Sequence, residues 1–163
     1  MKNEKIKFDK ATERKTPRAE RAREFQYREV LPDDFIKQRD QLPLSLLAFL
    51  TPHTAEDYRK QKTTLFLSED NHCGFGLTPD GNLISVFSLE KERGPALVKE
   101  ALARGAKSLS CVGQKLRELY EEAGFQVKKE EAWNQNYAPE YWDYDRFGTP
   151  DYYEMKLLKE AKD

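Results

Sequence analysis

The chain has 163 residues, of which 35% are charged and 38% hydrophobic, and its formal net charge is −1. This length fits one compact domain with enough volume for its own hydrophobic core. The sequence shows no signal peptide and no apolar run long enough to cross a bilayer, so we expect a cytoplasmic protein without a membrane partner.

Basic residues are concentrated at the N-terminal end. Residues 1–29 hold ten Lys/Arg against six Asp/Glu, a net of +4, which leaves −5 for the rest of the chain. Residues 1–23 contain few apolar side chains and no sustained periodicity, which predicts a flexible arm. Such an arm can dock on nucleic acid or on an acidic partner. A solvated tail without a partner is the interpretation we favour.

The first predicted strand covers residues 25–30, where aromatic and polar side chains alternate. Asp33 is a plausible cap for a helix over residues 34–41. Residues 44–60 supply further helical structure, in which Thr54 begins a capped helix whose first turn is acidic.

Three more strands follow. Residues 65–67 and 73–77 are short apolar runs joined by a turn over residues 68–72. Residues 78–82, Thr-Pro-Asp-Gly-Asn, form a turn cluster that leads into the central strand at residues 83–89.

The loop over residues 91–96 opens directly into an amphipathic run at residues 97–104. The first turn of a helix offers free N–H groups and a positive dipole end, which bind phosphate. Gly94 allows close approach of the backbone, and Pro95 suits the first helical position. Glu92 adds a negative charge to this loop, which Lys91 and Arg93 partly offset. An ordinary strand-to-helix turn explains the loop equally well.

A strand–helix unit completes this region. Gly105 ends the first helix, residues 107–111 predict a strand, and residues 114–123 predict a second helix that ends at Gly124. Cys111 in this strand and Cys73 in an earlier one are predicted to be buried free thiols, because two cysteines without a secretory signal rarely form a disulfide.

Two short patterns in this region resemble those of the GNAT superfamily of acyl-CoA-dependent N-acetyltransferases. The cofactor loop of that family, Gln/Arg-x-x-Gly-x-Gly/Ala, is matched by Lys91, Gly94 and Ala96, with a conservative change at the first position. The later family pattern Leu-Tyr-x-x-x-Gly-Phe is matched by Leu119, Tyr120, Gly124 and Phe125. The likeness extends over about residues 25–158.

The resemblance implies an α/β (α+β) fold with a mixed, mostly antiparallel, twisted sheet of about six or seven strands flanked by helices. Residues 152–158 would form the last strand. The domain would cover residues 24–158, followed by a short tail over residues 159–163.

The resemblance also implies acetyl-CoA as co-substrate. The central strand would splay from its neighbour, so that its amides bind the pantetheine arm and polarise the thioester carbonyl, and the loop would bind the pyrophosphate. The implied cofactor-binding residues are Phe87, Ser88, Leu89, Lys91, Glu92, Arg93, Gly94, Pro95 and Ala96. We expect no metal, because His53 and His72 are isolated and no Cys/His/Asp cluster has the spacing of a metal site.

By its position in the family pattern, Tyr120 would protonate the departing thiolate as a general acid. A structural helix tyrosine beside the sheet is the alternative. The sequence does not assign a general base, and a water chain would need none. The candidates are Glu69, His72, Glu90, Asp143 and Asp145.

Residues 132–151 form an unusually long connection that is rich in aromatic side chains. So much aromatic surface predicts an ordered segment, and in the family this connection borders the acceptor site. It could instead cover one end of the sheet as an accessory core, whereas interleaved carboxylates argue against stacking on single-stranded nucleic acid. The candidate acceptor residues are Trp133, Tyr141, Trp142, Asp143 and Asp145.

These observations favour an N-acetyltransferase that transfers an acetyl group from acetyl-CoA to a primary amine of a small molecule or protein. The alternative is a catalytically inactive module of the same fold that engages a macromolecular partner through the aromatic segment and the basic arm. Gly113 stands where many family members place a pantetheine-binding asparagine, seven residues before Tyr120.

Overall fold

The computed structural model describes residues 25–158. The predicted basic arm over residues 1–23 and the predicted tail over residues 159–163 lie outside the described residues.

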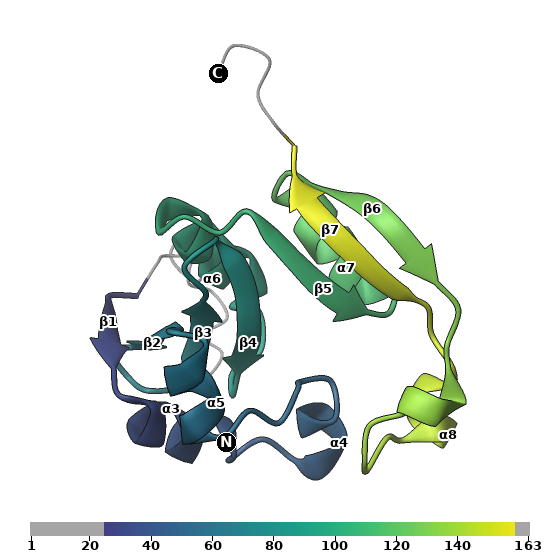
Figure 1. Cartoon of the computed structure of the whole chain (residues 1–163), viewed down its shortest axis with the longest axis horizontal. Helices are drawn as coiled ribbons and strands as arrows, with labels where there is room; N and C mark the ends of the chain where they lie inside the picture. Colours follow the sequence, from purple (N-terminus) through teal and green to yellow (C-terminus); the bar gives the residue numbers. More distant parts are fainter. Residues whose placement is uncertain (1–24, 159–163) are drawn as a thin grey trace, which may run out of the picture.

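Seven strands form one mixed sheet in the order β1-β2-β3-β4-β5-β7-β6 (Figure 1). The pair β4–β5 is parallel and every other neighbouring pair is antiparallel. This confirms the predicted mixed, mostly antiparallel sheet. The strands are β1 (Tyr27–Val30), β2 (Thr64–Ser68), β3 (Cys73–Leu77), β4 (Asn82–Ser88), β5 (Ser108–Val112), β6 (Phe125–Glu131) and β7 (Tyr152–Leu157).

Helices cover both faces of the sheet. Two of them, α3 and α5, pack against each other, and α3 also contacts β2 and β3. On the other face, α6 contacts β3, and α7 contacts β5 and β6. The helices are α3 (Pro32–Arg39), α4 (Leu44–Leu47), α5 (Ala55–Lys60), α6 (Gly94–Ala103), α7 (Gln114–Glu122), the 3₁₀ helix η1 (Gln135–Tyr137) and α8 (Tyr144–Phe147).

Two hydrophobic cores result from this arrangement. One surrounds Phe75, Leu97 and Met155 beneath α6 and α7, and the other surrounds Phe35 and Tyr58 beneath α3 and α5. Strand β4 contributes to both cores: Leu83 and Val86 belong to the first, and Ile84 and Phe87 to the second.

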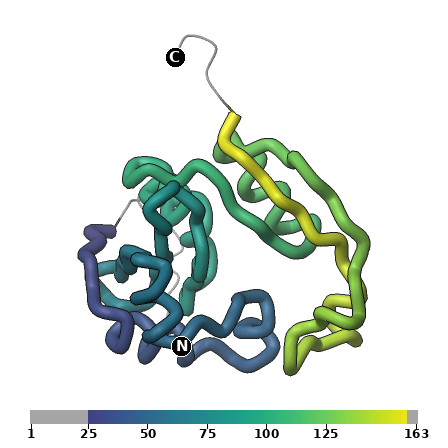
Figure 2. Tube along the Cα trace, in the orientation of Figure 1, coloured from purple at the N-terminus to yellow at the C-terminus, as the bar shows by residue number. Residues whose placement is uncertain are grey.

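The parallel pair β4–β5 is very short. Pairing joins Asn82 to Ser108 and Leu83 to Leu109, and then stops. The two strands diverge beyond this point, with α4 and α8 at the open end (Figure 1). The two arms of the resulting V are successive parts of the chain: purple to teal for the arm that contains β4, and green to yellow for the arm that contains β5 (Figure 2).

Of the two predicted helix caps, the structure confirms the one at Thr54 and contradicts the one at Asp33. Thr54 forms the predicted capping box with Asp57, each side chain accepting the other residue's backbone N–H. The prediction that Asp33 caps its helix is wrong: Leu31 is the cap residue, and Asp33 lies in the first turn. The reason is Pro32, which occupies the first helical position, where its missing N–H costs no hydrogen bond.

Cys73 and Cys111 are free and buried, as the sequence predicts. Burial raises the pKa of the Cys111 thiol to about 12, which keeps it protonated at neutral pH. Within residues 25–158, no helix combines the length and apolarity needed to cross a membrane.

Candidate functional site

Strand β4 separates from β5 after two paired positions, and we call the place where the two strands diverge the opening (Figure 1). Beyond Leu83, no strand in the described part of the chain pairs with this edge of β4. Backbone N–H and C=O groups need hydrogen-bond partners, and an extended ligand can supply them. The opening is therefore the natural place for a ligand to pair with β4 as an extra strand does.

The predicted cofactor residues at the end of β4 can offer little from their side chains. Phe87 is buried against Phe35, with ring centroids 5.4 Å apart. The Ser88 hydroxyl is held locally, because it donates to the Glu90 carbonyl oxygen and accepts from the Glu90 N–H. The Leu89 N–H donates to the carbonyl oxygen of His72 at 2.7 Å. Main-chain groups nearer the opening must therefore carry any contact with a ligand.

After β4, the chain turns through the loop and enters α6. The N-cap residue of this helix is Arg93, whose side chain forms no capping hydrogen bond with the first N–H groups. Gly94 is its first residue and Pro95 its second, which corrects the prediction that Pro95 comes first. Glu92 lies in the left-handed region with φ of 67°, which makes the turn sharp.

Gly94 is also a packing residue. A Cβ atom added to Gly94 would lie 3.3 Å from Leu119 Cδ2, closer than an ordinary van der Waals contact. The glycine therefore lets α6 approach α7, in addition to any approach by a phosphate.

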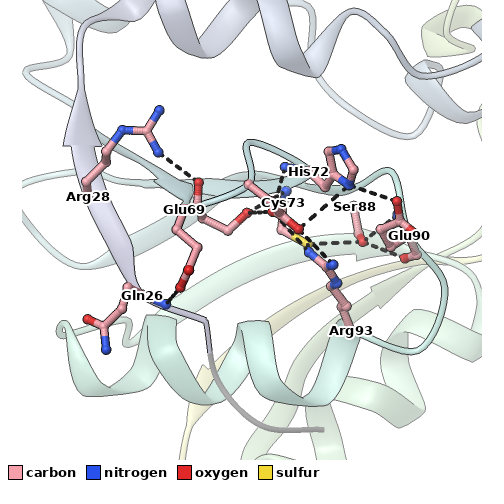
Figure 3. Close-up of polar contacts among 10 residues, drawn as sticks. Gln26, Arg28, Glu69, His72, Cys73, Ser88, Glu90 and Arg93 are labelled. Atoms are coloured by element: carbon pink, nitrogen blue, oxygen red, sulfur yellow. Dashed lines mark hydrogen bonds and ion pairs between the residues drawn. The ribbon is translucent and has the colours of Figure 1, made fainter. Parts of the chain in front are cut away.

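Arg93 turns its side chain away from the helix terminus, toward the turn between β2 and β3 (Figure 3). Its guanidinium donates to Asp70 at 2.8 and 3.2 Å and to the sulfur of Cys73 at 3.4 Å, and it lies over the Phe25 ring at 4.0 Å. Burial opposes both charges, but their hydrogen bonds outweigh it, so the pKa of Asp70 falls well below its usual range and that of Arg93 rises. We predicted Arg93 as a cofactor ligand, but its side chain is engaged with Asp70.

Two of the predicted candidate bases, Glu69 and His72, lie on the turn between β2 and β3, and a third, Glu90, lies in the loop after β4. His72 Nδ1 lies 2.8 Å from Glu90 Oε2, and Glu69 accepts the backbone N–H of Gln26 (Figure 3). These contacts stabilise the turn and its neighbouring loop. The other two candidates, Asp143 and Asp145, lie on the aromatic segment of residues 132–151.

Tyr120 is buried in α7, where its ring meets Phe125 edge-on at 5.9 Å. Burial raises its pKa, and the nearby Cys111 adds to this effect. The hydroxyl is therefore protonated at neutral pH. No hydrogen bond joins this hydroxyl to another of the described residues.

The aromatic segment is an ordered cluster around Trp142, which is only 7% exposed. The Trp142 ring lies 4.8 Å from both Trp133 and Phe49 and 5.5 Å from Phe147, and its Nε1 donates to the Gly148 carbonyl oxygen at 2.9 Å. Phe49 follows α4 in sequence. The cluster thus joins the two arms of the V at its open end.

The polar candidates of the aromatic segment differ in their roles. Asp143 caps α8 by accepting the backbone N–H of Arg146, whereas Asp145 and Tyr141 are exposed. Tyr141 has φ of 68°, a conformation that L-residues rarely adopt.

Sequence reasoning missed a buried polar chain that ends on β4. Arg39 donates to the Tyr58 hydroxyl at 3.0 Å and to the His53 carbonyl oxygen at 2.9 Å, and Tyr58 Oη lies 2.7 Å from Ser85 Oγ. Arg39, Tyr58 and Ser85 are all buried. A serine inside the apolar run of β4 was the one signal that could have pointed to this contact.

Within the described residues, no group of three or more His, Cys, Asp or Glu side chains could hold a metal ion.

Comparison with solved structures identifies the fold. The chain is similar to a GNAT family acetyltransferase from Streptococcus pneumoniae, at 18% identity over 83% of this chain and 100% of that one, with a TM-score of 0.53. It is also similar to a GNAT family acetyltransferase from Elizabethkingia anophelis with acetyl-CoA bound, at 16% identity over 82% and 97% of the two chains, with a TM-score of 0.52. A third similar structure is a phosphinothricin acetyltransferase from Sinorhizobium meliloti in complex with acetyl-CoA, at 11% identity over 85% and 91% of the chains, with a TM-score of 0.52.

These likenesses show that the chain has the fold of the GNAT superfamily. At such low identity they do not carry a substrate across. No protein-family model and no curated protein sequence matches the chain.

Proposed function

We propose that this chain is an N-acetyltransferase that transfers the acetyl group of acetyl-CoA to a primary amine of a small molecule or a protein. The observation that carries the proposal is the opening beyond Leu83 and Leu109: the part of β4 that β5 does not pair with continues to Ser88, and the loop after it enters α6 at Gly94. Two of the similar structures hold acetyl-CoA.

The chain has the groups that acetyl-CoA requires. The unpaired edge of β4 supplies N–H and C=O groups for the amides of the pantetheine arm, and the first turn of α6 supplies N–H groups for the pyrophosphate. Pro95 offers no N–H, and the side chain of Arg93 is held by Asp70. The phosphate contacts would thus come from the main chain of the loop and from Lys91, which is exposed.

In the proposed reaction, the amine nitrogen attacks the thioester carbon, the carbon–sulfur bond breaks, and the sulfur leaves as a thiolate. An N–H of β4 stabilises the negative charge that develops on the carbonyl oxygen. Tyr120 donates its proton to the thiolate, since burial keeps its hydroxyl protonated and no described protein group accepts that proton. The proton lost by the amine passes to water or to a base.

The aromatic segment would form one wall of the acceptor site. It closes on Phe49 at the open end of the V, which is the side of β4 from which an amine can reach the opening. Trp142 and Trp133 fix the wall, while Tyr141 and Asp145 are exposed and could contact an acceptor.

One observation supports the alternative of an inactive binding module. The loop's second basic side chain, Arg93, is engaged with Asp70 rather than directed to the helix terminus, and this lowers the positive charge available to phosphates. In that case the aromatic segment would bind a macromolecule.

Titration calorimetry with acetyl-CoA and with CoA separates the two functions. An enzyme should bind both ligands and release CoA when primary amines are added, and the ligands should raise the melting temperature of the protein. The absence of binding at millimolar acetyl-CoA would favour the binding module instead.

A further inference from the structure

Strand β4 contains a bulge at the place where it leaves β5. Gly76 pairs with Ile84 and Gly74 pairs with Phe87, so two residues of β4, Ser85 and Val86, stand opposite one residue of β3. An extra residue of this kind bends the strand and turns its main-chain groups in new directions.

The bulge also reverses the side-chain pattern of β4. Ile84 and Phe87 pack in the core beneath α3 and α5, and Ser85 points to Tyr58 in the same core. Leu83 and Val86 belong to the core on the opposite face. The bulge therefore places successive residues 84 and 85 on one face, which a regular strand cannot do.

Ser85 occupies a conformation that glycine would adopt more easily. Its φ of 57° lies in the left-handed region, where a Cβ atom is crowded. A serine at this position needs a compensating interaction, and the hydrogen bond between Ser85 Oγ and Tyr58 Oη at 2.7 Å supplies one.

Arg39 leaves the proton of Tyr58 available for this hydrogen bond, in which either hydroxyl can be the donor. A guanidinium only donates, so the Tyr58 oxygen accepts from Arg39 Nη1 at 3.0 Å. The single proton of Tyr58 is then free to be donated to Ser85 Oγ. Arg39 is in turn held by the His53 carbonyl oxygen and by Asp40, at 2.9 Å each. The chain of bonds thus runs from α3 through α5 to the bulge.

We propose that Arg39, Tyr58 and Ser85 are positioning residues that hold the bulge of β4 in the one conformation in which its N–H groups, beside the opening to β5, are aimed at the thioester carbonyl of acetyl-CoA. This inference rests on the proposed function. Under this proposal α3 and α5 help to position the main chain of β4 through Arg39 and Tyr58. These two residues need not contact the co-substrate.

Two variants test the chain of bonds with little loss of packing. Tyr58→Phe keeps the ring contacts to Phe35 at 5.8 Å and to His53 at 5.1 Å, and removes only the hydroxyl. Ser85→Gly removes the hydroxyl and adopts the positive φ without strain. Tyr27→Phe is the matched control, because Tyr27 lies on β1 and packs against Phe75 in the other core.

The readouts are the affinity for acetyl-CoA, the turnover number with a primary amine, and the infrared carbonyl stretch of bound acetyl-CoA labelled with ¹³C at the carbonyl. In the wild-type protein the stretch should lie at lower frequency than in free acetyl-CoA, because an aimed N–H polarises the carbonyl. Tyr58→Phe and Ser85→Gly should each lose most of that shift and about tenfold in kcat, with affinity changed by less than about threefold. Tyr27→Phe should change none of these values.

The outcomes separate this inference from the proposed function. Failure of the wild-type protein to bind acetyl-CoA would remove both. Binding without a carbonyl shift, or a shift that both variants retain, would overturn the inference alone. Amide hydrogen exchange provides a ligand-free check: exchange at residues 85–87 should become faster in Tyr58→Phe than in the wild type, and unchanged protection there would also contradict the inference.

Discussion

The guanidinium of Arg93 donates two hydrogen bonds to the carboxylate of Asp70 and thereby ties the loop before α6 to the turn between β2 and β3. The two side chains are partly buried, and the Ser68 hydroxyl and the His72 N–H also donate to Asp70. In the proposed function this loop binds the pyrophosphate of acetyl-CoA, and the contact with Asp70 should then lower the entropy cost of ordering the loop on binding.

Asp70→Asn should therefore weaken acetyl-CoA binding several-fold and lower the free energy of unfolding by about 1 kcal/mol, a value reduced for the partial exposure of the pair. Denaturant unfolding and calorimetry measure the two effects. Asp80→Asn is the control, because Asp80 lies in a different turn and bonds to Thr78. Equal affinity of Asp70→Asn and wild type would mean that the loop keeps its conformation without the anchor.

The stabilising effect of Asp70 should depend on pH in one direction. Its carboxyl has a lower pKa in the folded protein than in the unfolded chain, so the unfolded state binds more protons in acid. The contribution is complete above about pH 4, the ordinary pKa of an aspartate, and is lost as the pH falls through the folded-state pKa. The stability difference between wild type and Asp70→Asn should hence be constant from pH 5 to 8 and shrink in stronger acid.

Tyr120→Phe separates catalysis from structure. If Tyr120 is the general acid, kcat should fall by on the order of 100-fold. Because no described residue forms a hydrogen bond with the hydroxyl, the free energy of unfolding should change by less than about 0.5 kcal/mol. Since burial raises the pKa of Tyr120, its ionisation should not reduce activity up to pH 9. Undiminished kcat in Tyr120→Phe would assign this tyrosine to the core alone.

What the sequence could predict depended on the distance between interacting residues along the chain. Thr54 and Asp57 are three residues apart, and the capped helix start that they form could be predicted from the sequence. The strands and the order of the two motifs around Gly94 and Tyr120 could be predicted as well. The direction of Arg93 was not readable, because its partner Asp70 is 23 residues away. The sequence motif around Gly94 predicts the turn of the backbone. The direction of the Arg93 side chain depends on a partner that is distant in sequence.

The bulge of β4 was hidden for a related reason. The residues 83–89 have the apolar character of an ordinary strand, and only the pairing with Gly74 and Gly76 of β3 reveals the extra residue. Ser85 and Tyr58 are 27 residues apart, so neither sequence neighbourhood indicates the other.

Gly94→Ala tests whether the glycine serves packing or phosphate approach. The new methyl group would crowd Leu119, which should cost stability by up to about 1 kcal/mol and move the start of α6. Leu119→Ala makes room on the opposite helix. If packing is the main role, then the double variant Gly94→Ala/Leu119→Ala should bind acetyl-CoA as Leu119→Ala alone does. Binding that stays weak in the double variant would show that the phosphate needs the space above Gly94.

The aromatic cluster should act as a rigid wall whose polar rim selects the acceptor. Trp142→Ala removes a buried ring and its hydrogen bond to Gly148, and it should cost about 3–5 kcal/mol of unfolding free energy, which denaturant titration measures. Tyr137→Ala is the matched control, since Tyr137 is 83% exposed and its loss should change stability by no more than about 0.5 kcal/mol.

The exposed Asp145 should contribute to binding of the acceptor amine and should not contribute to binding of acetyl-CoA. A carboxylate beside the opening attracts a protonated amine, so Asp145→Asn should raise KM for the acceptor while the affinity for acetyl-CoA and the melting temperature stay as in the wild type. Asp143 also caps α8. Because asparagine caps as well as aspartate, Asp143→Asn should leave stability nearly unchanged, whereas Asp143→Ala should lower the free energy of unfolding by about 0.5–2 kcal/mol. If Asp145→Asn leaves KM unchanged for every amine that the protein acetylates, the acceptor must reach the opening by another side of the cluster.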